Sequence, residues 1–107
     1  MAADRNALPK GLLEDVKNAL DITWGDEGTD RKYEGIIALG MVYLNGKLGA
    51  DADYTKDSLA RLLLFEYVRY ARDAALDVFE HNYMAHILAM QNERAVSLYA
   101  ESTKQTE

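Results

Sequence analysis

The stretch from Leu62 to Tyr83 constrains the fold most, because its pattern is that of one long helix. It contains no Gly and no Pro, and its apolar residues recur at the ~100° spacing of an α-helix. One arc of the helical wheel collects Leu63, Leu64, Tyr67, Val68, Tyr70, Ala71, Ala74, Ala75 and Val78. With the residues just before it, this stretch predicts a helix over 57–81, roughly 25 residues and ~37 Å long.

The other side of this predicted helix mixes apolar with charged residues. A helix with a clean core face and a partly apolar back has surface to bury on both sides. Either the N-terminal helix or the C-terminal segment covers the back, or a second copy or another protein does. Trp24, in the loop 21–29, is either a lid on the core or a partner contact. The candidate subunit or partner interface is therefore Leu62, Phe65, Arg69, Arg72, Leu76, Phe79 and Trp24.

Two further helices precede this one, over 9–20 and 30–44. Thr29 or Asp30 is expected to cap the second by accepting backbone N–H bonds, and Asn45 with Gly46 is expected to end it. Gly40 lies on its apolar stripe, which indicates a close approach of another helix. After residue 82 the pattern weakens to a short fourth helix, and 94–99 is either a helix end or an extended arm.

These elements predict an all-α fold, a small bundle of three to four helices with one long central helix and a flexible C-terminal arm. At 107 residues the chain is expected to be a single domain, 1–107. Its core should span about 8–91. The N-terminal 1–7 and the C-terminal 92–107 are expected to be flexible or to become ordered on a partner.

Charge and composition exclude several classes of function. The net charge is -6 and the sequence pI is about 4.8, which argues against a protein that grips nucleic-acid phosphates. There is no Cys, so disulfides and thiolate metal sites are ruled out. No apolar run approaches the ~20 residues of a membrane span, and the first residues lack the apolar stretch of a signal peptide.

No pattern predicts catalysis, a cofactor or a metal. The two His, His81 and His86, are five residues apart and do not share a helix face as metal-binding pairs do. The acids of 51–57 begin like a calcium loop, but Lys56 and Leu62 replace the Gly and Glu that such a loop needs. We expect no catalytic residues, no cofactor and no metal, and we do not expect an enzyme.

Three segments carry a resemblance to a known family. They are LLEDVKNALDITW (12–24), DRKYEGIIALGMVYLNGKLG (30–49) and LARLLLFEYVRYARDAALDVFEHNYMAHILAMQ (59–91). Their order and spacing resemble the head–tail connector proteins of long-tailed bacteriophages, small helical adaptor or head-completion proteins. The likeness covers about 8–91 and rests on packing patterns. It carries over no catalytic residue.

The resemblance implies a structural virion protein at the head–tail junction, present in the host cytoplasm during assembly. It implies a ring of about twelve copies that closes on itself and docks on the portal protein. The ring would extend the DNA channel and offer an attachment surface to the next neck or tail protein. DNA would pass through without sequence-specific binding, and no membrane is involved. The alternative is a small helical regulatory or DNA-binding module.

Overall fold

The computed structural model describes residues 8–23 and 25–105. These residues form four helices and no strand: α1 (Leu12–Ala19), α2 (Glu27–Leu48), α3 (Leu59–Arg72) and α4 (Leu76–Gln105). The predicted all-α class and the small helical bundle are confirmed. The expectations for 1–7 and for Trp24 lie outside the described residues.

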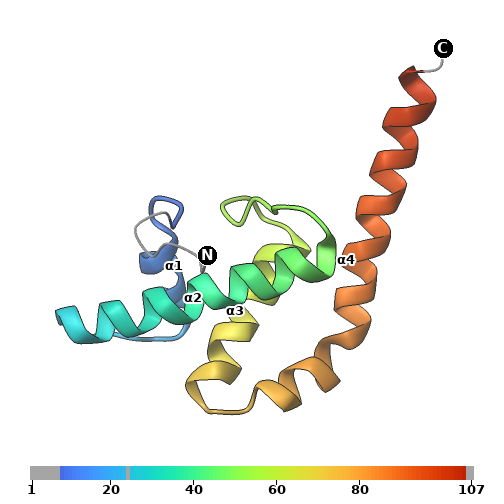
Figure 1. Ribbon diagram of the computed structural model, residues 1–107. Coiled ribbons are helices and arrows are strands. Elements are labelled where there is room, and N and C mark those ends of the chain that lie inside the picture. The colour runs from blue at the N-terminus through green and yellow to red at the C-terminus, as the bar shows by residue number, and fades with distance from the viewer. Residues whose placement is uncertain (1–7, 24, 106–107) are drawn as a thin grey trace.

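The four helices make an elongated protomer (Figure 1). α2 crosses α3, α1 lies beside them, and α4 passes the C-terminal end of α2 before its last turns extend beyond the other helices. The radius of gyration is 15.2 Å and the principal extents are 55 × 29 × 26 Å. A compact chain of about 100 residues would have a radius near 13 Å. The projecting part of α4 accounts for this excess length.

α2 begins earlier and ends later than its sequence pattern predicts. Asp26, not Thr29 or Asp30, is the N-cap, and its carboxylate accepts a 2.8 Å hydrogen bond from the Thr29 amide. The helix continues through Asn45 and Gly46 and stops at Gly49, which has a φ of 82°. The helix ends at Gly49 because its left-handed backbone lets its amide donate to the Asn45 carbonyl. The side-chain oxygen of Asn45 accepts a 2.6 Å bond from the Tyr54 hydroxyl and holds the following loop.

The expectation of one helix over 57–81, and with it one long central helix, is wrong. α3 ends at Arg72, and Ala74 adopts a left-handed φ of 54°. The Ala75 amide then donates to the Tyr70 carbonyl at 2.9 Å, which closes the helix end. A left-handed alanine costs about 1–2 kcal/mol. The turn is stable because it folds α4 back onto α3 and buries Phe79.

α4 is also longer than expected. In place of a short helix and a flexible arm, residues 76–105 form one continuous helix of 30 residues. Its ribbon bends after the first turns and then runs straight to the C-terminal end (Figure 1). Residues 92–105, predicted to be flexible or ordered by a partner, are the projecting continuation of this helix.

The core lies where α3 meets α2 and α4, with α1 closing one side. Phe79 is its aromatic centre, 1% exposed, with four tyrosine rings at centroid distances between 5.3 and 6.3 Å. These rings are Tyr43, Tyr67, Tyr70 and Tyr83. The full core is Leu12, Val16, Leu20, Ile22, Tyr33, Ile37, Leu44, Tyr54, Ala60, Leu63, Leu64, Tyr67, Val68, Phe79, Ile87 and Met90.

Gly40 is confirmed as the point where α2 and α3 approach closely. A Cβ at this position would lie 2.8 Å from Leu64 Cδ1 and 2.8 Å from Tyr67 Cδ1. We expect Gly40→Ala to lower the free energy of unfolding by about 1–3 kcal/mol, because the packed core must shift to admit the methyl group. Urea denaturation followed by circular dichroism measures this change.

Gly46 provides the matched control in the same helix. A Cβ there meets nothing within 4 Å, so Gly46→Ala should raise the free energy of unfolding by roughly 0.5–1 kcal/mol through helix propensity alone. If both alanines stabilise the protein equally, the close approach of α2 and α3 at Gly40 is not tight.

Candidate interaction surface

Three of the candidate interface residues meet in one surface hollow. Leu62, Phe65 and Arg69 line a depression of about 410 Å³ on α3, and Ala19 of α1 also lines it. Leu62 is 47% exposed and Phe65 is half-buried. We call this depression the α1/α3 hollow. Its apolar floor is open to a side chain from another molecule.

Ionic contacts hold the rim of the α1/α3 hollow in place. The Arg61 guanidinium lies 4.7 Å from the centre of the Phe65 ring, and its Nη2 is 3.1 Å from Asp15 Oδ2 of α1. Arg69 Nε lies 3.5 Å from Glu66 Oε1. Each exposed pair contributes little to stability, but together they fix the side chains around an apolar floor.

The remaining candidate residues have other roles. Arg72 Nη1 donates a 3.3 Å hydrogen bond to the Leu20 carbonyl, which ties the end of α3 to the end of α1. Leu76 begins α4 and is 38% exposed. It lines a separate small hollow with Tyr43 and Glu80. Phe79 is buried inside the protomer, so it does not lie on an exposed helix back as the sequence predicts.

A further exposed surface lies on α4, outside the candidate interface residues that the sequence predicts. From Met84 onward, all charged residues of this helix fall within an arc of about 100°. Up to Ser102 these residues are Glu93, Arg94 and Glu101. The same side of the helix carries the buried Ile87 and Met90. The outward side therefore carries no charge.

We call this outward side the uncharged face of α4. It comprises Met84, Leu88, Ala95, Val96, Leu98 and Tyr99, with Ala85, Ala89, Ala100 and the polar Asn92 between them. Leu88 is 56% exposed, Val96 60% and Tyr99 74%. An exposed helix of a monomer normally turns its polar side to water. Here residues 95–102 are all exposed, so the uncharged side faces water as well as the charged side, and the central part of an interface is depleted of charge in the same way.

No family model, curated protein or solved structure matches this chain. None of the described helices combines the length and apolar character required to cross a membrane. Within residues 8–23 and 25–105, no group of three or more potential ligands is placed to hold a metal ion.

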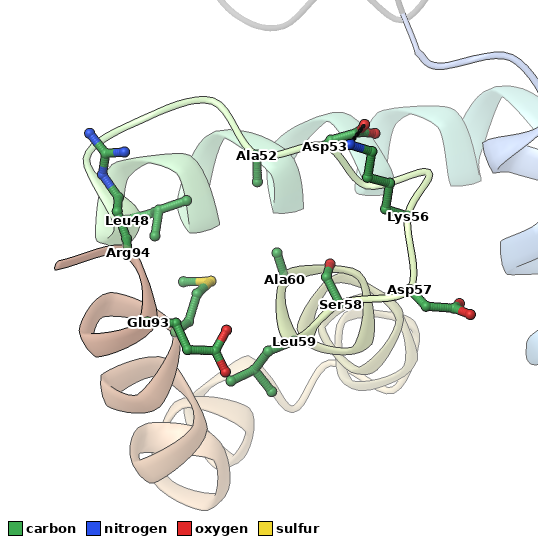
Figure 2. A pocket seen from close by; sticks show the side chains of 11 residues that line it. Leu48, Ala52, Asp53, Lys56, Asp57, Ser58, Leu59, Ala60, Glu93 and Arg94 are labelled. Carbon is green, nitrogen blue, oxygen red and sulfur yellow. Dashed lines mark ion pairs between the residues drawn. The ribbon is translucent and has the colours of Figure 1, made fainter. Parts of the chain in front are cut away.

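A third hollow lies where the end of α2, the loop 49–58, the start of α3 and α4 meet (Figure 2). It encloses about 360 Å³. Figure 2 shows Ala52 and Ala60 facing one another across it, beside Leu48. Ser58 lies on its edge and is engaged as the N-cap of α3, accepting a 3.2 Å bond from the Arg61 amide. Small apolar side chains with a charged rim suit a protruding side chain better than a reaction.

A polar cluster joins the second half of α2 to the start of α4. The Tyr43 hydroxyl donates a short hydrogen bond to Glu80 Oε2, and Lys47 Nζ lies 3.5 Å from the same oxygen. The bond from Tyr43 and the charge of Lys47 lower the pKa of Glu80 below its usual value. Burial and the bond to Glu80 raise the pKa of Tyr43.

This cluster makes the stability depend on pH in a defined direction. Because the pKa of Glu80 is lowered on folding, its contribution is present above the ordinary value of 4.5 and is lost as the pH falls through the folded-state pKa. We expect the stability difference between wild type and Glu80→Gln to be largest at neutral pH and to shrink below pH 4.5. Urea denaturation over a pH series measures it.

Glu101→Gln, on the exposed end of α4, is the matched control and should change stability little at any pH. A wild-type advantage over Glu80→Gln that grows as the pH falls would contradict the role assigned to the cluster.

Proposed function

We propose that this chain is a structural subunit of the head–tail junction of a long-tailed bacteriophage. In this proposal it forms a homo-oligomeric ring, docks on the portal protein, extends the DNA channel and offers an attachment surface to the next neck or tail component. Its resemblance to the connector family over about 8–91 and its all-helical architecture support the proposal.

The uncharged face of α4 is the observation that carries this proposal. The last turns of α4 extend beyond the body of the protomer (Figure 1), and Val96 and Leu98 on them are exposed. Most helical stability in proteins comes from packing of an apolar face. A projecting helix that exposes apolar side chains would therefore be stabilised in an assembly, by contact with another subunit or with a docking partner.

The charge balance also supports a channel component. A ring around packaged DNA has to let it slide, and a strongly basic lining would hold DNA through counterion release. The net charge of -6 favours passage over retention. It disfavours the alternative, a small DNA-binding module, which would need a basic recognition surface.

Electron microscopy of purified protein with purified portal rings tests the proposal. We expect negatively stained particles in which extra density extends the portal channel, and co-sedimentation of the chain with the portal. A chain that fails to bind the portal and also forms no ring would overturn the proposal. Tight binding to duplex DNA at low salt would point to the regulatory alternative.

A further inference from the structure

The turn between α3 and α4 is short and carries backbone strain. It consists of residues 73–75, between the end of α3 and the start of α4. Ala74, in its middle, is exposed and has a left-handed φ of 54°. An alanine adopts this conformation at a cost, whereas a glycine adopts it freely. Because Ala74 is exposed, packing of its own side chain does little to offset that cost.

The same segment has the sequence of an unbroken helix. Residues 62–83 contain no Gly and no Pro, and alanine has the highest helix propensity of all residues. In a straight helix, Ala74, Ala75 and Val78 would continue the apolar arc of α3. The turn interrupts this arc and leaves Val78 42% exposed. The local sequence thus favours a straight helix, and the packing of α4 on the bundle maintains the turn.

Beyond the turn, α4 runs back along α3 in the antiparallel direction. The Tyr83 hydroxyl of α4 donates a 3.1 Å hydrogen bond to Glu66 Oε1 in the second half of α3. Further along α4, Met90 lines the same hollow as Leu59, the first residue of α3. The two helices therefore form a hairpin, and the turn is its hinge.

The contacts that hold α4 on the bundle come from residues after the hinge. Phe79 lies in the aromatic core. Glu80 accepts a hydrogen bond from Tyr43 and pairs with Lys47, and Gln91 Nε2 donates a 2.8 Å bond to the Lys47 carbonyl. These contacts do not depend on the covalent connection between α3 and α4. The α4 of a second copy presents the same side chains and fits the same site.

We propose that two copies of this chain exchange α4, so that α4 of each copy packs on α2 and α3 of the other. The hinge straightens, and residues 59–105 become one helix of ~70 Å. The contacts of α4 are remade between the copies, the strain at Ala74 is released and the apolar arc becomes continuous. A short hinge under strain favours such an exchange, and its reciprocity closes the assembly as a two-fold dimer. This inference does not depend on the proposed function.

Substitutions at the hinge test the exchange. Glycine at position 74 would relieve the turn and weaken the straight helix, and each dimer has two hinges. We therefore expect Ala74→Gly to lower the dimer association constant by about a hundredfold or more. Ala74→Val should raise it, because a β-branched residue is a genuine outlier in the left-handed conformation. Sedimentation velocity over a concentration series, on proteins unfolded in urea and refolded so that exchange can equilibrate, measures both.

Ala85→Gly is the matched control. Ala85 is exposed and lies within α4, so it is helical in the closed protomer and in the exchanged dimer. Glycine weakens the helix equally in both arrangements, and the association constant should hardly change. If Ala85→Gly lowers association as much as Ala74→Gly, the hinge has no special part in it and the inference is wrong.

A distance within one chain distinguishes exchange from any other dimer. Asp57 and Glu93 are exposed and line the same hollow (Figure 2). The chain has no cysteine, so Asp57→Cys with Glu93→Cys accepts two spin labels. Refolding the labelled chain in excess unlabelled chain leaves pulsed electron paramagnetic resonance to measure distances within single chains. The closed protomer gives a short distance across the hollow. The exchanged dimer gives roughly 50 Å along one straight helix.

The long distance should appear in the dimer fraction and disappear when Ala74→Gly is added to the labelled chain. A dimer that keeps only the short distance would show that the copies associate through another surface with α4 in place. A refolded wild-type chain that stays monomeric at every concentration would show that no exchange occurs. Either result overturns the inference.

Discussion

Replacing Phe79 with Ala should lower the free energy of unfolding by about 3–5 kcal/mol, the range for removal of a buried aromatic side chain. Phe79 is 1% exposed and lies among the rings of Tyr43, Tyr67, Tyr70 and Tyr83. These rings come from α2, α3 and α4, so the cavity would loosen the contacts that hold α4 against the bundle. For a small domain this is a large fraction of the total stability.

Urea denaturation at a protein concentration that keeps wild type and variant in the same oligomeric state measures the loss. Val78→Ala is the control on the adjacent residue, which is 42% exposed, and it should cost much less. A Phe79→Ala protein that unfolds like wild type but fails to assemble would contradict the structure and would indicate that Phe79 lies in the subunit interface.

Leu98→Glu should leave the protomer folded and weaken its assembly by about thirtyfold or more. Leu98 lies on the uncharged face of α4, 45% exposed, so a charge there costs the isolated protomer little. In a contact between subunits the same charge would lose its water. Central interface residues contribute about 2 kcal/mol or more, and each 1.4 kcal/mol changes the association constant about tenfold.

Ser97→Glu is the matched control. Ser97 is the preceding residue, is also exposed, and lies on the side of α4 that already carries Glu93 and Glu101. Sedimentation velocity over a concentration series compares the two variants with wild type. If Ser97→Glu weakens assembly as much as Leu98→Glu, the effect is general charge repulsion and the uncharged face has no special part in it.

Local pattern was sufficient to predict the helical class and the closeness of α2 and α3. Gly40 stands on an apolar stripe, and only a close neighbour explains a glycine there. The break after α3 was not predictable in this way. Ala74 takes a left-handed conformation without the Gly or Asn that usually marks one. Burial of Phe79 stabilises that turn, and such long-range packing is invisible to a local pattern.

The candidate interface was predictable only in part. The structure brings Leu62, Phe65 and Arg69 together in the α1/α3 hollow, but it buries Phe79. The apolar period of residues 82–99 is weak, so it does not predict the uncharged face of α4. The informative signal was the charges, all confined to one arc from Met84 onward. Their placement marks the outward face more clearly than the hydrophobic residues do.

Molar mass from light scattering, measured on the eluting wild-type protein over a range of concentrations, tests the central claim most directly. A chain whose projecting helix exposes an uncharged side to water should associate. The molar mass should rise from that of the 12.0 kDa protomer to a fixed whole-number multiple of it, as expected for a closed ring. A mass of one protomer at every concentration, unchanged when portal rings are added, would contradict the account.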